Sequence, residues 1–131
     1  MKLWIDDVRP APEGYEWLFS VRQTIEYIQM IEDYQNRWNS FKNPVNHFTT
    51  DQGRVELLVM IDEFITDNTI ELIDIDHDAG DEAYDGGDYI NLLDWLERTG
   101  RNYPIRIHSM NPVGRENMRA IIRRNGWTEV F

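Results

Sequence analysis

The chain has 131 residues, of which 41% are hydrophobic and 12% aromatic, a composition typical of one folded domain with a single core. It has no cysteine, so disulfides, thiolate catalysis and zinc–thiolate sites are excluded. The net charge of −11 argues against binding nucleic acid by charge alone. Asp6 and Asp7 stand where a signal peptide needs an apolar core, and no apolar run has membrane-spanning length, so we expect a cytoplasmic protein.

The first half of the chain predicts two short strands and a helix. Residues 2–5 and 15–19 read as strands, separated by a loop with two prolines and a glycine. Ser20 and Gln23 form a capping-box pattern, so we expect a helix from Ser20 that ends between Glu32 and Trp38. Residues 45–50 could form an edge strand, and an apolar stripe predicts a second helix capped by Asp51.

The second half alternates strands and helices. We expect strands at 70–75, 105–108 and 127–131, with one helix capped by Asp88 and another that begins at Asn111 and Pro112. This alternation predicts an α/β fold: a mostly parallel, five-stranded sheet with helices on both faces, a three-layer α/β/α sandwich. We expect a single domain over residues 1–131, with an insertion or extra helix at about residues 33–68.

Carboxylates follow two of the predicted strands. Parallel strands in one sheet would bring these carboxylates to one crevice, where α/β folds place their ligands. Oxygen ligands of this kind suit Mg²⁺ or Mn²⁺. The candidate metal ligands are Asp6, Asp7, Asp76 and Asp78. The alternative is that some of these acids cap loops or helices. Asp74 faces the same side as Asp76, and we expect it to be a buried, hydrogen-bonded acid rather than a ligand.

Two histidines lie at the ends of predicted central strands. His77 and His108 are candidate general acids or bases near neutral pH, and the alternative for each is a structural role.

An anion site is predicted at the start of the last helix, within a stretch, residues 98–124, that holds seven Arg and one acid. Free backbone N–H groups and the helix dipole favour phosphate there. The candidate phosphate-binding residues are Arg9, Ser109, Asn111, Gly114 and Arg115. Asn111 could instead be an ordinary helix cap, Arg115 could belong to a solvated face, and Arg9 could pair with Asp6 or Asp7.

Three ordered blocks carry a family resemblance: Leu3 to Pro10, Ile75 to Gly80 and Ile107 to Met118. Together they resemble the cyclic-phosphate processing receiver domains of bacteria and phages. The resemblance implies a flavodoxin-like, receiver-type sheet with an acidic Mg²⁺ pocket. It also implies that Asp6 and Asp7 are the metal-binding pair, Asp76 the counterpart of the phosphoacceptor aspartate and Ser109 the conserved hydroxyl residue.

Two departures from the receiver pattern bear on function. The receiver lysine near the end of the last strand has no counterpart in residues 127–131, which argues against storing a phosphate on Asp76. His77 and His108 are additions that fit the processing of cyclic phosphates.

The leading hypothesis is a metal-dependent phosphoesterase acting on a cyclic or terminal phosphate of a nucleotide or an RNA end. Its catalytic residues would be His77, His108, Asp76 and Ser109. The alternatives are a phosphorylatable regulatory switch at Asp76 and a non-catalytic acidic binding or inhibitor protein of phage type.

Overall fold

The computed structural model of the chain describes residues 1–42 and 69–131, with side chains of the first range described as far as Arg37. Two compact units can be distinguished: Met1–Tyr27 with Ile70–Phe131, and Ile28–Thr69. The predicted second helix from Asp51 and the possible edge strand at 45–50 lie outside the described residues. The prediction of a single domain with an insertion at 33–68 therefore stays a prediction.

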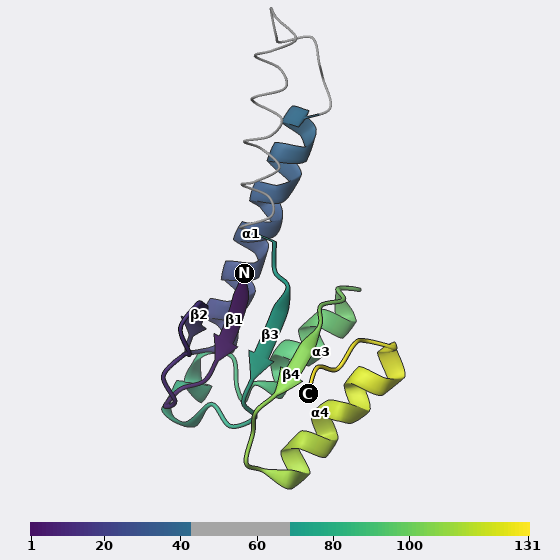
Figure 1. Cartoon of the computed structure of the whole chain (residues 1–131). Coiled ribbons are helices and arrows are strands. Elements are labelled where there is room, and N and C mark those ends of the chain that lie inside the picture. Colours follow the sequence, from purple (N-terminus) through teal and green to yellow (C-terminus); the bar gives the residue numbers. More distant parts are fainter. Residues whose placement is uncertain (43–68) are drawn as a thin grey trace, which may run out of the picture. The chain divides into compact units, whose positions relative to one another are not determined.

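A parallel sheet organises the first unit (Figure 1). Its strands are β1 (Lys2–Ile5), β2 (Tyr15–Leu18), β3 (Leu72–Ile75) and β4 (Ile105–Ile107), in the order β2-β1-β3-β4. Every strand pair in this sheet is parallel. The α/β, receiver-like fold class predicted from the alternation of strands and helices is therefore confirmed.

The expected fifth strand is reduced to one bridge. Glu129 pairs in parallel with Ile105 of β4, and backbone hydrogen bonds join Ile105 to Thr128 and Val130 on either side. The backbone N–H of Trp127 still donates to Ile122 in the preceding helix. The segment therefore reaches β4 only at its middle, and the described part of the sheet has four strands.

The connection from β1 to β2 contains no helix. It spans residues 6–14, fewer than the roughly twelve or more that parallel crossovers usually need. In the described residues, this connection therefore adds no helix to either face of the sheet. One face of the sheet carries buried aliphatic side chains, among them Leu3, Ile5 and Ile73, whereas Trp4 and Trp17 on the other face are partly exposed.

Helix α1 (Val21–Lys42) begins as its sequence predicts. The Ser20 hydroxyl accepts from the backbone N–H of Gln23, and the Gln23 side chain accepts from that of Phe19. The predicted end between Glu32 and Trp38 is wrong, because the helix continues to Lys42. No glycine or proline interrupts residues 21–42, so no strong stop signal occurs before Pro44 in the sequence.

Two more helices complete the first unit: α3 (Ile90–Arg98) and α4 (Pro112–Asn125). The predicted cap at Asp88 is wrong, since Tyr89 is the N-cap of α3 and the Asp88 carboxylate instead accepts from the backbone N–H of Ala79. A short 3-10 helix, η2 (Gly80–Asp85), fills the loop after β3. None of the helices in residues 1–42 and 69–131 combines the length and the apolar character needed to cross a membrane.

Candidate functional site

Hydrogen bonds of the sheet continue one residue past three strands and fix where the polar residues emerge. The backbone N–H of Asp6 donates to Leu18, that of Asp76 to Ile5, and that of His108 to Ile75, at 3.2, 2.9 and 3.0 Å. Each of these residues directly follows its strand. Because the strands are parallel, Asp6, Asp76 and His108 leave the sheet at the same edge.

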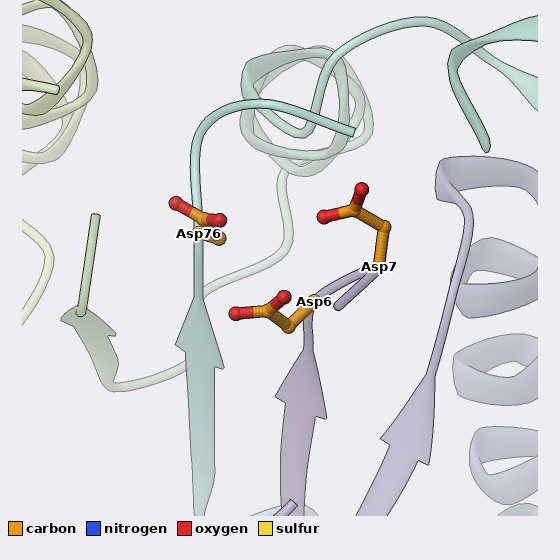
Figure 2. A group of neighbouring side chains, drawn as sticks. All are labelled: Asp6, Asp7 and Asp76. Atoms are coloured by element: carbon orange, nitrogen blue, oxygen red, sulfur yellow. The ribbon is translucent and has the colours of Figure 1, made fainter. Parts of the chain in front are cut away.

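Three carboxylates meet at this edge, and we call Asp6, Asp7 and Asp76 the acidic group. One oxygen from each lies within 4.8 Å of the others. Figure 2 shows them converging at the ends of β1 and β3. Asp78, the fourth predicted ligand, lies outside this group, and its Oδ1 contacts His77 instead.

Crowding of like charge shapes the electrostatics of the acidic group. Partial burial raises the pKa of Asp7 above its ordinary value, and the charges of Asp6 and Asp76 raise it further. Tyr89, which is fully buried beneath the group, donates its hydroxyl to the carbonyl of Phe19 at 2.6 Å. Burial raises the pKa of Tyr89, and the nearby carboxylates add to that shift.

The loop after β3 approaches the Asp7 side chain closely at Gly80. Gly80 has φ of +53°, in the left-handed region, and a Cβ there would collide with Asp7 Oδ2. The backbone of the loop therefore packs directly against a member of the acidic group. This glycine brings the start of η2 to the rim of the site.

His77 is held between a carboxylate and helix α4. Its Nδ1 lies 2.8 Å from Asp78 Oδ1, and its side chain is 15% exposed. A Cβ on Gly114, in the first turn of α4, would lie 2.5 Å from the His77 ring. Gly114 therefore makes room for the imidazole, a role different from the predicted contact with phosphate.

His108 is partly buried in a polar network, with 9% of its side chain exposed. Its Nε2 lies 2.8 Å from Asp6 Oδ2 and its Nδ1 2.7 Å from Asp74 Oδ1. The indole of Trp4 stacks on the imidazole, with ring centroids 3.9 Å apart and an interplanar angle of 3°. Both ring nitrogens are occupied, so His108 has no nitrogen available to a substrate in this conformation.

Most side chains of the predicted anion site already form hydrogen bonds with nearby backbone groups. Asn111 is the N-cap of α4 and accepts from the backbone N–H of Gly114 at 3.0 Å, as expected of an ordinary cap. The buried Ser109 accepts from the backbone N–H of Asn111 at 3.1 Å. The guanidinium of Arg9 donates to the carbonyl of His108 at 3.1 Å.

Arg115 differs from these residues. Its Nε is buried, and within residues 1–42 and 69–131 no hydrogen-bond acceptor reaches it. Unpaired buried donors are uncommon in folded proteins and call for a partner. Arg115 therefore has a buried donor available to a ligand.

Two features of the site were not anticipated from the sequence: the stacking of Trp4 on His108 and the pairing of Asp74 with His108. Asp74 was expected to be buried and hydrogen-bonded, and it is 0% exposed. The even spacing of Trp4 and Asp6 along one strand, and of Asp74 and Asp76 along another, was the available signal, because alternate residues share a face.

Comparison with known families now adds to this geometry. Residues 52–124, more than half of the chain, match the model of the cyclic-phosphate processing receiver domain. The matched range includes Asp76, His77, His108 and Arg115, whereas Asp6 and Asp7 precede it. No significant match was found among curated proteins or among solved structures. The chain therefore belongs to the cyclic-phosphate processing receiver domain family, as its three sequence blocks indicated.

Proposed function

We propose that this protein is a metal-dependent phosphoesterase that processes a cyclic or terminal phosphate on a nucleotide or an RNA end. The observation that carries the proposal is the convergence of Asp6, Asp7 and Asp76 at one edge of the sheet. His77 directly follows Asp76 in the chain. Membership of a family described by cyclic-phosphate processing supports the same reaction class.

The acidic group fits a divalent cation of the hard type. Three carboxylate oxygens lie within 4.8 Å of one another and offer the hard oxygen donors that Mg²⁺ and Mn²⁺ take together with water and phosphate oxygens. Asp7 and Asp76 are partly exposed, so their oxygens are open to an ion and to water. When bound, the cation would stabilise charge on the phosphate and lower the pKa of a bound water. In this proposal Asp78 orients His77 rather than binding metal.

His77 is the proposed proton carrier. An ionised carboxylate can only accept, so Asp78 fixes the tautomer of His77 with the hydrogen on Nδ1. Nε2 is then left with its lone pair, and within the described residues it has no hydrogen-bond partner. This arrangement suits a general base that takes a proton from water and returns it to the leaving oxygen.

The positive charge for the phosphate would come from arginine. Arg115 offers a buried Nε that is unpaired within the described residues, in the first turn of α4, and it directly follows Gly114, which packs against the His77 ring. Arg9 is exposed and close to the same edge through its bond to the His108 carbonyl. Two guanidinium groups suit the oxygens of a phosphodiester. Ser109 and Asn111 would act mainly by shaping the loop between β4 and α4.

The decisive experiment is a screen of 2′,3′-cyclic and 3′,5′-cyclic nucleotides with Mg²⁺ or Mn²⁺. We expect turnover by the wild-type protein, and loss of turnover in Asp76→Asn. Glu97→Gln removes a carboxylate between α3 and α4 and serves as the matched control, with activity near wild type. The proposal fails if no substrate turns over while the acidic group binds metal normally.

A second candidate is a phosphorylatable switch with Asp76 as acceptor. It is favoured by the partly exposed position of Asp76 at the end of β3, next to an acid pair. Incubation with acetyl phosphate and Mg²⁺ followed by intact mass measurement separates the two. A lasting phosphate adduct that disappears in Asp76→Asn would support the switch, and no adduct is expected of an esterase.

A non-catalytic acidic binding protein is the remaining alternative, favoured only by the net charge of −11. Capture of one stoichiometric protein partner, with no metal binding by calorimetry, would favour it over both phosphate functions.

A further inference from the structure

Asp74 is a fully buried acid that the proposed reaction does not use. It lies on β3 in register with Trp4 of β1 and Arg106 of β4, and its side chain is 0% exposed. Its Oδ1 is 2.7 Å from His108 Nδ1. Its Oδ2 is buried and, in the described part of the chain, has no hydrogen-bond donor, although Arg106 Nη1 lies 3.8 Å away. Burying a carboxylate oxygen without a hydrogen-bond donor costs folding free energy, so we expect Asp74 to have a role that offsets this cost.

His108 transmits the position of Asp74 to the acidic group. The imidazole is fixed by a carboxylate on each ring nitrogen and by the stacked indole of Trp4 on its face. The backbone N–H of His108 also donates to the carbonyl of Ile75 in β3. With only 9% of the side chain exposed, little room remains for another rotamer. A displacement of the Asp74 carboxylate therefore moves His108 Nε2.

The position of His108 Nε2 in turn restricts the orientation of the Asp6 carboxylate. Its Oδ2 faces His108, and its Oδ1 accepts from the backbone N–H groups of Val8 and Arg9, each at 2.9 Å. Partners on both oxygens hold the carboxylate plane in one orientation. That orientation decides which lone pairs Asp6 turns toward Asp7 and Asp76.

We propose that Asp74 is a positioning residue which, through His108, fixes the orientation of the Asp6 carboxylate and thereby sets the affinity of the acidic group for a divalent cation. The part that concerns affinity rests on the proposed function, whereas the orientation of Asp6 does not. Metal sites in general depend on such outer partners, whose loss costs about 10- to 100-fold in affinity.

The test of orientation needs no metal. In ¹H–¹⁵N spectra of the metal-free protein, the Val8 and Arg9 amides report on Asp6 Oδ1. We expect Asp74→Asn and His108→Gln to shift both signals and to speed their hydrogen exchange, while Glu97→Gln leaves them unchanged. Wild-type shifts and exchange at Val8 and Arg9 in folded Asp74→Asn would overturn the proposal. If Asp74→Asn fails to fold, His108→Gln alone decides it by the same signals.

The test of affinity uses Mn²⁺ titrations by calorimetry at a temperature where each variant is folded. Asp74→Asn should weaken binding about tenfold or more. Adding Asp74→Asn to His108→Gln should then change the affinity by less than about twofold, because the two residues act in series. If the two residues had only independent structural roles, their separate losses of Mn²⁺ affinity would add in the double variant. That result would overturn the inference.

The two proposals fail in different ways. Absence of Mn²⁺ binding by the wild-type protein would sink the phosphoesterase and the affinity part together, while the Val8 and Arg9 amides would still decide the positioning of Asp6. Normal wild-type binding with no change in Asp74→Asn would sink the positioning inference alone. Arg106→Gln, which leaves the contact between Asp74 and His108 intact, should stay within about twofold of wild type.

Discussion

Acids are arranged in opposite ways in two regions of the same unit. In the acidic group, Asp6, Asp7 and Asp76 crowd together and the pKa of Asp7 is raised. Between α3 and α4, Glu97 receives a bidentate contact from Arg124, at 2.6 and 2.8 Å, and the pKa of Glu97 falls to about 2. We call the second region the paired cluster. Carboxylates paired with arginine stabilise the fold, whereas crowded carboxylates repel one another, and this contrast is why we propose the acidic group as the cation site.

Removing the imidazole beside the acidic group should have the largest effect. His77→Ala deletes the proposed proton carrier, so we expect turnover to fall by about 10²- to 10⁴-fold, the usual contribution of general acid–base catalysis. Mn²⁺ affinity should change little, because His77 is not a member of the acidic group. Steady-state kinetics and calorimetry on the same sample check both. Equal losses of binding and turnover would contradict the assigned role.

Filling the space beside His77 should have the next largest effect. In Gly114→Ala the new Cβ would lie 2.5 Å from the His77 ring, so the imidazole or α4 has to move. Overpacking of this kind typically costs about 1–3 kcal/mol of folding free energy. We expect a lower melting temperature together with reduced turnover. Gly126 has φ of +66°, and a Cβ there meets nothing within 4 Å, so Gly126→Ala is a control that should lower the melting temperature through backbone strain but leave turnover near wild type. An unchanged turnover in Gly114→Ala would contradict the packing argument.

Removing the charge of Asp7 should raise the stability of the folded protein in the absence of metal. Because the pKa of Asp7 is raised in the folded protein, its ionisation disfavours folding, and this cost appears as the pH rises above the ordinary value of 3.8. Asp7→Asn should therefore melt higher than wild type near neutral pH, with the gain disappearing in acid. Thermal melts across pH without divalent cations measure it. A lower melting temperature of Asp7→Asn at neutral pH would contradict the unfavourable effect of burial and neighbouring charge on the Asp7 carboxylate.

Breaking the paired cluster should have the smallest effect and the opposite pH dependence. The lowered pKa of Glu97 means that its pairing stabilises the fold above the ordinary value of 4.5, and that this contribution disappears as the pH falls toward 2. Glu97 is partly exposed to solvent, which screens its ion pair, so Glu97→Gln should lower the melting temperature only slightly at neutral pH. Mn²⁺ affinity should match wild type. A large loss of metal binding would show that the two regions are coupled.

The sequence predicted the parts of the fold that depend on local patterns. The four strands follow from short runs rich in apolar residues, and the starts of α1 and α4 from a Ser20 cap and an Asn111–Pro112 start, and all were found. The misplaced features lack such signals. No stop residue marks the end of α1 at Lys42, and Asp88 has the side chain of a cap but uses it on Ala79.

The convergence of the acids was also within reach of the sequence. Asp6 and Asp76 directly follow strands, and the carboxyl ends of parallel strands share one edge of a sheet. That rule needs only the order of elements. It requires no knowledge of how any side chain is turned.

The surroundings of the two histidines were decided by tertiary structure alone. His77 and His108 look alike in the sequence, each at a strand end, yet one lies against Asp78 and Gly114 and the other is buried between Asp74 and Asp6. His108 is separated along the chain from Asp74 by 34 positions and from Asp6 by 102. Pairing over such separations depends on strand register, which a local pattern does not contain. The sequence by itself thus determined which residues reach the edge of the sheet, and the register of the strands decided which of them face one another.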